Sequence, residues 1–326
     1  EEGYNKYIKS LIPKGSTCVV TIGSIGKKMT MAHCDLFINQ AMNAIIPNEN
    51  FDNEYVYYAV KNILPNIKML DSGTASGREN VSKSAFSKMQ ILIEDNIITQ
   101  RRIAEILSRY DSLIENYQKQ IKLLEESAQR LYKEWFVDLR FPGHENTKIV
   151  DGVPEGWEKT CLKEVSHILT GKKDANFGDV GGEYLFFTCA KEPIRASSYS
   201  FDCDAVILAG NGDFNVKLYR GKFEAYQRTY VFSPFNSINL FLLFYSVNSS
   251  MQQLFMGVSG STIKFLTKQM LEQISILLPS SKIATQFYEV CDRNQKKVEI
   301  LKRQIDILTE ARDRLLPKLM NGEIEV

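Results

Sequence analysis

Apolar side chains recur at alternating intervals of four and three residues between positions 100 and 135, a stretch that contains no glycine or proline. This spacing is typical of a coiled-coil helix, because it keeps one apolar stripe on one face. The stripe consists of Ile103, Leu107, Tyr110, Ile114, Tyr117, Ile121, Leu124, Ala128, Leu131 and Trp135. The pattern predicts one long helix over residues 99–137 with a single apolar seam.

The same alternation returns 184 residues further along the chain, from position 103 to position 287. Its members are Phe287, Cys291, Asn294, Val298, Leu301, Ile305, Leu308, Arg312, Leu315 and Leu319. We therefore expect a second long helix over residues 281–322, ended by Pro317 and by Asn321 with Gly322. The two seams can bury each other, and we expect an antiparallel coiled coil with a globular region at each end. For Asn294 and Arg312 we favour a seam that faces solvent or a partner; the alternative is that they are buried and set the register.

Two globular regions precede the two helices, and their expected elements follow the same order. The first, over residues 1–98, has strands at 17–22, 36–46 and 91–93, a turn at Gly23, a helix at 53–64 and a loop at 71–80. The second, over 154–280, has strands at 205–209, 230–232 and 276–278, a turn at 210–213, a basic stretch at 217–222, a helix at 240–255 and a loop at 257–262. A linker over 138–153 separates the halves. The predicted class is α+β: two pseudo-repeated mixed α/β domains joined by an antiparallel pair of long helices.

The repeat also suggests that the first region is shorter than the second. Gly23 corresponds to Gly210 and Gln40 to Gln227, both at a separation of 187 residues. The second region begins near Pro154, and 154 minus 187 is negative. We therefore expect the first region to lack about its first thirty residues, as an N-terminally truncated chain would.

Composition limits the possibilities without choosing a function. The 326 residues are 44% hydrophobic and 24% charged with a net charge of +1, which fits about two globular domains. The six cysteines form no C-x-x-C pair, so we expect reduced thiols and a cytoplasmic protein. We expect no membrane segment, because the longest apolar run, at 238–247, is too short. The small net charge means that any nucleic-acid binding must depend on local placement of charge.

Several longer motifs resemble one protein family. Residues 100–107 (QRRIAEIL), 123–126 (LLEE) and 131–143 (LYKEWFVDLRFPG) resemble the central conserved helix of the specificity subunit of type I restriction-modification enzymes. Residues 154–157 (PEGW) resemble the start of its target-recognition domains, and 314–323 (RLLPKLMNGE) resemble its C-terminal helix end. The resemblance implies two target-recognition domains that each read half of a split duplex DNA sequence, and helices that set the gap. It also implies docking of two methyltransferase subunits, joined by restriction and translocase subunits.

Candidate DNA-binding residues are polar or basic side chains near the expected turns and loops. Arg, Lys, Asn and Gln can reach base edges, whereas Lys, Ser and Thr more often hold phosphates. Ordinary surface polarity explains any single one of them about equally well. The candidates are Lys27, Lys28, Gln40, Asn43, Arg78, Asn80, Lys83, Asn211, Lys217, Arg220, Lys222, Gln227, Arg228, Ser261, Thr262 and Lys264.

No catalytic motif is recognisable in the sequence. The segment from Gly23 to Lys27 lacks the spacing and the Ser or Thr of a phosphate-binding loop, and the three histidines show no metal-ligand spacing. None of the 39 acidic residues has a lysine two positions later, as metal-dependent nucleases usually do, and no methyltransferase motif occurs. We expect a non-catalytic subunit without a cofactor or metal of its own. The resemblance places S-adenosylmethionine, ATP and Mg²⁺ in partner subunits.

Two other interpretations remain open at this stage. A structural coiled-coil adaptor with two protein-binding heads would explain the helices equally well, but not the basic Gly/Ser loops of both heads. A silent partial specificity cassette would fit the expected truncation.

Overall fold

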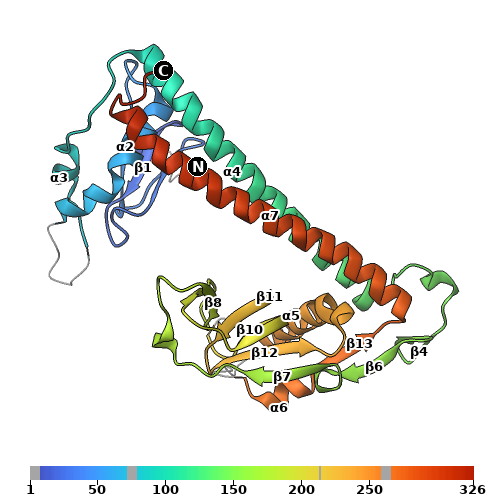
Figure 1. The fold of residues 1–326 in the computed structure, drawn as a ribbon. Coiled ribbons are helices and arrows are strands. Elements are labelled where there is room, and N and C mark those ends of the chain that lie inside the picture. Colours follow the sequence, from blue (N-terminus) through green and yellow to red (C-terminus); the bar gives the residue numbers. More distant parts are fainter. Residues whose placement is uncertain (1–7, 72–78, 213, 258–265) are drawn as a thin grey trace. The chain divides into compact units, whose positions relative to one another are not determined.

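The structure is a computed structural model that describes residues 8–71, 79–212, 214–257 and 266–326 (Figure 1). The chain divides into two compact units. Unit 1 comprises Glu1–Gln120 with Ile300–Val326, and unit 2 comprises Ile121–Glu299. Each unit contains one globular region and a part of both long helices, and the mixed helix and sheet content confirms the predicted α+β class.

Unit 1 contains a three-stranded antiparallel sheet in the order β2-β1-β3. Its elements are η1 (Ile8–Ser10), β1 (Thr17–Val20), β2 (Met29–Met31), β3 (Met42–Ile45), α2 (Asn53–Ile63), η2 (Leu64–Leu70) and α3 (Lys83–Ser87). Helix α2 begins after Asp52, whose side chain accepts a hydrogen bond from the Tyr55 N–H, as N-cap residues do. The expected strand at 36–46 is shorter than predicted, because residues 39–41 form a turn ahead of β3.

Helix α2 joins two apolar clusters of unit 1. Val56 and Val60 pack with Val19 of the sheet. Tyr55, Tyr58 and Ala59 pack with side chains of the two long helices. The helix is thus a layer between the sheet and the helix pair.

Unit 2 is built around a six-stranded sheet in the order β7-β12-β10-β11-β8-β9, in which only the β11–β8 pair is parallel. These strands are β7 (Ser166–Thr170), β8 (Tyr184–Phe187), β9 (Ile194–Ala196), β10 (Phe201–Ala209), β11 (Val216–Ala225) and β12 (Thr229–Pro234). The other strands are β4 (Ile149–Val150), β5 (Val153–Pro154), β6 (Glu158–Cys161) and β13 (Ser275–Leu278), which form the pairs β4–β5 and β6–β13.

The helical elements of unit 2 are α5 (Leu240–Gly257) and α6 (Lys268–Glu272), with the short 3₁₀ turns η4 (His144–Asn146), η5 (Leu162–Glu164), η6 (Ala175–Phe177) and η7 (Ser237–Asn239). Leu243 and Val247 of α5 share a buried cluster with Val206 and Phe232 of the sheet. On its other side, the Tyr245 ring lies 6.2 Å from that of Phe287 in the second long helix. Helix α5 is therefore a middle layer, as α2 is in unit 1.

The internal repeat is visible in strand order. In unit 1 the central strand β1 lies between β2 and β3, and in unit 2 the strand β10 lies between β11 and β12, with every pair antiparallel. A helix that covers the sheet follows the third strand in both cases. This common arrangement confirms the predicted pseudo-repeat of two mixed α/β regions.

One predicted strand is absent from unit 1. Residues 91–93 have no regular secondary structure, whereas the corresponding residues 276–278 lie in β13. Strand β13 forms because β6 pairs with it through the register Ile276 to Thr160. Among the described residues of unit 1 no strand pairs with 91–93, and an extended segment without such a partner does not form a ladder.

The long helices are α4 (Ile97–Tyr132), continued by the π-helix η3 (Lys133–Val137), and α7 (Ser281–Met320). In unit 1, Ile103 and Leu107 of α4 pack with Leu319 and Leu316 of α7, and Asp111 binds Arg312. As the residue number increases along α4, the number of the contacting residue in α7 decreases, so the two helices are antiparallel there. The same holds within unit 2, where the Phe136 ring lies 4.9 Å from that of Phe287, and Ala128 shares a cluster with Cys291.

The seam positions are all buried or half-buried, whereas Leu123 and Ile307, two apolar residues outside the seam, are exposed. Pro317 does not end α7 as predicted, since the helix continues to Met320. Burial of Leu319 and Met320 offsets the one hydrogen bond that the proline cannot donate. The prediction that the seam faces solvent or a partner at Arg312 is wrong. The Arg312 side chain is 13% exposed and is paired with Asp111.

The predicted linker at 138–153 contains part of a small hairpin. Strand β4 pairs with β5, and Asp151 and Gly152 between them both have positive φ, at 51° and 76°. Two such residues form the type I′ turn that suits a tight hairpin. Among the described residues, none of the helices combines the length and the apolar character needed to cross a membrane.

Candidate nucleic-acid interface

Four loops of unit 2 meet at one end of the six-stranded sheet. Their backbone hydrogen bonds join Gly171 N–H to Thr229 O (3.0 Å), Gly210 N–H to Arg228 O (2.8 Å) and Tyr226 N–H to Phe187 O (2.9 Å). We call residues 171–174, 188–191, 210–212 and 226–228 the loop edge of unit 2. Loops that extend from a rigid sheet are common positions for binding residues.

Glycine is required at two positions of this edge because backbones approach closely there. A Cβ atom at Gly171 would lie 2.2 Å from the carbonyl oxygens of Ala225 and Tyr226. A Cβ at Gly210 would lie 2.4 Å from the Arg228 oxygen. The absence of a side chain at these two glycines thus lets the loops approach each other closely.

Of the candidate residues in unit 2, Asn211, Gln227 and Arg228 lie on the loop edge, and Lys217 reaches it from β11. The exposed Gln227 side chain donates a hydrogen bond to Asp174 Oδ1 over 2.8 Å. Lys217 Nζ donates to Ala190 O over 2.8 Å and contacts Asn215 Oδ1. Burial lowers the pKa of Lys217. Lys217 therefore fixes the 188–191 loop rather than presenting a free charge.

Arg228 is an exposed cation of the loop edge. It is exposed, and its carbonyl accepts hydrogen bonds from Gly210 N–H and from Cys189 Sγ, the latter over 3.6 Å. The guanidinium makes no hydrogen bond or ion pair with any other residue that the structure describes. A fixed backbone with a free guanidinium suits bidentate contact with a guanine edge or a phosphate.

The sequence reasoning missed two lysines at the same edge. Lys172 is exposed, and Lys173 Nζ lies 4.3 Å from the Phe177 ring centroid. Both backbone N–H groups donate to Ala225 O. A signal was present, because the tripeptide Gly-Lys-Lys at 171–173 also occurs at 26–28, where Lys27 and Lys28 were identified.

Two candidates of the basic stretch 217–222 lie away from the loop edge. That stretch is not a loop but part of β11, in which successive side chains point to opposite faces. Arg220 Nη1 donates to Asp292 Oδ1 over 2.6 Å, and its guanidinium lies 5.2 Å from the Phe241 ring centroid. Arg220 therefore ties the sheet to α7 instead of facing outward.

Lys222 is exposed near the amino end of β10, opposite Asp202 in the ladder. Its Nζ lies 4.8 Å from the Tyr199 ring centroid, and hydrogen bonding to Tyr199 raises the pKa of Lys222. The strand thus separates Lys222 from Lys217, although the sequence places them close together.

Unit 1 has an equivalent edge where β1 ends. Hydrogen bonds from Thr21 N–H to Ala41 O (2.8 Å), Gly23 N–H to Glu79 O (3.1 Å) and Val81 N–H to Thr21 O (2.9 Å) join three segments there. We call residues 21–28, 39–43 and 79–81 the loop edge of unit 1. It is the counterpart of the edge formed after β10.

The candidates at this edge differ in how free their side chains are. Lys27, Lys28 and Gln40 are exposed. Asn43 Nδ2 donates to Thr21 Oγ1 over 2.9 Å, so part of its hydrogen-bonding capacity is used internally. Asn80 forms a bridge with Ile22 and donates its N–H to Asp71 Oδ1 over 2.8 Å.

Lys83 lies just beyond the loop edge of unit 1. It is the first residue of α3, and it is exposed. The candidates Arg78, Ser261, Thr262 and Lys264 fall outside the described residues.

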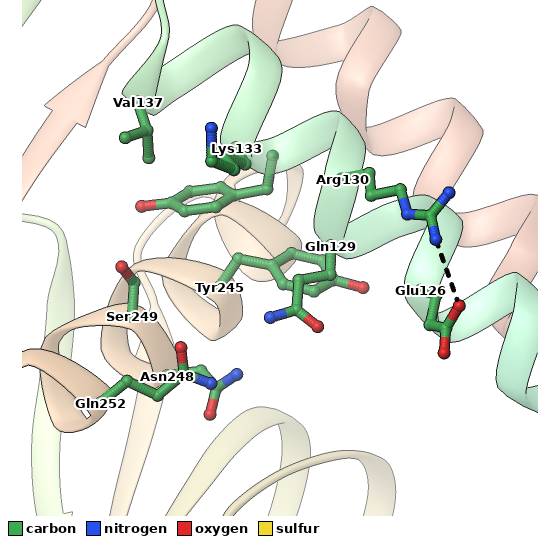
Figure 2. A pocket seen from close by; sticks show the side chains of 10 residues that line it. Glu126, Gln129, Arg130, Lys133, Val137, Tyr245, Asn248, Ser249 and Gln252 are labelled. Atoms are coloured by element: carbon green, nitrogen blue, oxygen red, sulfur yellow. Dashed lines mark hydrogen bonds and ion pairs between the residues drawn. The ribbon is translucent and has the colours of Figure 1, made fainter.

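A different concave surface of unit 2 lies between the end of α4 and α5 (Figure 2). This pocket has a volume of about 390 Å³ and is lined by Glu126, Gln129, Arg130, Tyr132, Lys133, Val137, Tyr245, Asn248, Ser249 and Gln252. Its two cations are already paired: Arg130 with Glu126 at 3.5 Å and Lys133 with Asp138 at 2.6 Å. The pocket is therefore less suited to a phosphate than the loop edges.

Together these features define a class: an α+β protein with an internal repeat, in which each repeat presents Gly- and Lys-containing loops and adjoins an antiparallel helix pair. The family model described as "Type I restriction modification DNA specificity domain" matches residues 1–126 and 154–316. The chain therefore belongs to this family of type I restriction-modification specificity proteins, as the sequence motifs indicated.

Relatives and a solved structure agree with this assignment. The chain is 39% identical over 176 residues to the type I restriction enzyme EcoDI specificity subunit of Escherichia coli, covering 53% of this chain and 39% of that protein. It is 25% identical over 349 residues to the MjaIX specificity subunit of Methanocaldococcus jannaschii, covering 97% and 79%. The crystal structure of a type I restriction-modification S subunit from M. genitalium shares the fold, with a TM-score of 0.62, 19% identity and coverage of 94% and 83%.

Proposed function

We propose that this chain is the DNA-reading subunit of a type I restriction-modification complex, in which each globular region reads half of a split duplex target. The main support for this proposal is that both repeats have the same strand order and carry a loop edge after the corresponding strand. Two related scaffolds with different loop side chains are what recognition of two different half-sites requires.

The two loop edges divide naturally into phosphate and base contacts. The paired lysines, Lys27 with Lys28 and Lys172 with Lys173, follow glycines in both units and suit the phosphate backbone. Arg228 in unit 2 and Gln40 in unit 1 have exposed side chains of the types that recognise purine edges. The lysines would position the duplex, and the Arg and Gln side chains would distinguish its sequence.

The long helices are proposed to set the gap between half-sites and to bind two methyltransferase subunits, which restriction and translocase subunits join. Helices α4 and α7 are continuous over 36 and 40 residues, so their length is fixed by hydrogen bonding rather than by a flexible linker. Exposed apolar side chains outside the seam, including Leu113 and Ile307, are available for further helices.

Catalysis is proposed to belong to the partners. S-adenosylmethionine, ATP and Mg²⁺ would bind to methyltransferase and restriction subunits, while this chain supplies target choice. The support is the sequence itself, which carries no methyltransferase or nuclease motif. The purified chain should transfer no methyl group from S-adenosylmethionine to DNA, and turnover by this chain alone would refute the assignment.

The test is methylation mapping with the reconstituted complex of this chain and its methyltransferase subunit. A split motif is expected, and Arg228→Ala should relax only one of its halves. Insertion of one heptad into each long helix adds about 10 Å and should lengthen the gap by about three base pairs. A continuous motif, or a gap unaffected by the insertions, would contradict the proposal. A complex that assembles but never binds DNA would favour the adaptor interpretation.

A further inference from the structure

Two polar side chains of the loop edge of unit 2 bind each other. Gln227 Nε2 donates a hydrogen bond to Asp174 Oδ1 over 2.8 Å, and both side chains are exposed. They belong to different loops and lie 53 positions apart in the chain. Asp174 directly precedes the turn η6, but its side chain caps no N–H of that turn. The Asp174 carboxylate thus binds Gln227 instead of the nearby backbone, to which Asp side chains at such positions commonly bond.

The backbone beside both side chains is also held in place. Gln227 N–H donates to Lys173 O over 2.9 Å, and the following carbonyl, Arg228 O, accepts from Gly210 N–H over 2.8 Å. Phe177 N–H donates to Asp174 O over 3.1 Å. Because the backbone is already ordered, the Gln227 amide loses little conformational freedom when it binds a ligand.

Asp174 determines which end of the Gln227 amide faces it. An ionised carboxylate only accepts hydrogen bonds, so the amide nitrogen and not the oxygen lies against Asp174. The second N–H of Nε2 and the carbonyl Oε1 make no hydrogen bond with any other residue that the structure describes. Gln227 therefore offers an external ligand one donor beside one acceptor, in a fixed order.

This fixed order distinguishes the two purines in the major groove. Adenine presents the N7 acceptor and the N6 amino donor, which match a glutamine N–H and carbonyl oxygen. Guanine presents two acceptors, N7 and O6, so the glutamine oxygen would face O6 with no proton between them. A free glutamine could turn its amide over and donate to O6. A glutamine bound to a carboxylate loses that hydrogen bond if it turns.

We propose that Gln227, oriented by Asp174, reads an adenine in the half-site of unit 2. This inference rests on the proposed DNA-reading function and adds the base and the two residues that select it. Gln227 Oε1 accepts from adenine N6 and Nε2 donates to N7, while Asp174 is a positioning residue. A carboxylate at this edge repels phosphates, and the charges of Lys172 and Lys173 in the same loop offset that repulsion. Asp174 therefore contributes to base selection and not to affinity.

The test is selection of bound DNA from a library of duplexes with randomised half-sites, using the complex of the full chain with its methyltransferase subunit. At one position of one half-site, the wild-type complex should prefer adenine over guanine by about tenfold or more. Gln227→Ala should abolish this preference at that position alone. Asp174→Asn keeps the shape of the side chain but can donate as well as accept, so it should lower the ratio by about threefold or more.

A second pair of a glutamine and a carboxylate provides the matched control. Gln295 Nε2 donates to Glu299 Oε1 over 3.1 Å on α7. Gln295→Ala and Glu299→Gln make the same kinds of change away from the loop edge, so both should leave the adenine preference as it is in the wild-type complex. Circular dichroism of each variant verifies that it is folded.

Two results would overturn the inference and leave the proposed function intact. One is a split motif in which no position changes its preference for adenine in Gln227→Ala. The other is an adenine preference that Gln227→Ala removes but Asp174→Asn does not alter, which would show that Asp174 only joins the two loops. A wild-type complex that binds no duplex would instead refute the proposed function, and this inference with it.

Discussion

Arg220 in β11 donates a hydrogen bond from Nη1 to Asp292 Oδ1 in α7 over 2.6 Å, and the pair ties the sheet of unit 2 to the second long helix. The side chains are 22% and 15% exposed, and Tyr288 OH lies 3.4 Å from Arg220 Nη2. The sequence suggested that Arg220 contacts DNA. Its position between Phe241 and α7 instead gives it a part in holding the globular region in place.

Asp292→Ala is expected to lower the free energy of unfolding by about 1–3 kcal/mol, because it leaves the half-buried Arg220 without its main partner. Denaturant titration followed by circular dichroism measures the change. Arg314→Ala is the control: Arg314 pairs with Glu310 on the surface, at 79% and 60% exposure, and its loss should change stability by less than about 0.5 kcal/mol. Equal effects of the two variants would remove the structural role of the Arg220–Asp292 pair.

The lowered pKa of Asp111 leads us to expect that the protein loses stability in acid. Burial alone would raise its pKa, but the hydrogen bond from Arg312 and the charge of Lys61, 3.3 Å away, outweigh burial and lower it. A carboxyl group with a lowered pKa stabilises the fold above its unfolded pKa of about 3.9, and this contribution is lost as pH falls through the folded value.

The wild-type chain should therefore be more stable than Asp111→Asn at neutral pH, and the difference should shrink below about pH 4. Urea unfolding at a series of pH values measures it. A difference that stays constant down to the acid transition would show that the Asp111 charge is not linked to folding.

Gly171→Ala should destabilise unit 2 by about 2 kcal/mol or more, because the new Cβ would lie 2.2 Å from two backbone oxygens at the loop edge. Gly181→Ala is a matched control: the nearest atom to its Cβ, Asp179 Oδ1, would be 3.7 Å away. Thermal unfolding distinguishes the two. A Gly171→Ala protein with unchanged melting would mean that the loops can separate without cost.

The loop edge of unit 2 predicts two different effects on DNA binding. Arg228→Ala should weaken binding to the specific target by about 1–3 kcal/mol and relax its sequence preference if Arg228 reads a base. Lys172→Ala should weaken specific and random duplexes alike and lower the salt dependence by about one charge. Anisotropy titrations at several salt concentrations separate these outcomes. Unchanged affinity and target in both variants would remove this edge from the interface.

The apolar seam should contribute far more to stability than the exposed apolar residues of the same helices. Leu107 of α4 is fully buried in a cluster with side chains of α2 and α7. Leu107→Ala should therefore lower the free energy of unfolding by about 2–5 kcal/mol. Ile307 is 67% exposed, and Ile307→Ala should change stability by less than about 0.5 kcal/mol. A comparable loss in both variants would contradict the assignment of the seam.

Tertiary contacts decided which candidate side chains are available. The sequence placed Lys217, Arg220 and Lys222 in one basic stretch, but strand alternation and packing direct them to Ala190, Asp292 and Tyr199 respectively. The repeated Gly-Lys-Lys tripeptide pointed to Lys172 and Lys173, but only their backbone hydrogen bonds to Ala225 show that they lie at the loop edge. Such positions depend on which strands pair, and pairing partners far apart in sequence leave little local signal.

The sequence by itself determined the long helices, their seam, the internal repeat and the family. These features have period and spacing, which are local properties that burial of an apolar stripe imposes on every turn. Only the tertiary structure decided that β13 forms while residues 91–93 do not, because a strand exists only where a partner satisfies its backbone. It likewise decided that Arg312 is half-buried, since Asp111 compensates a charge that the seam pattern alone would exclude.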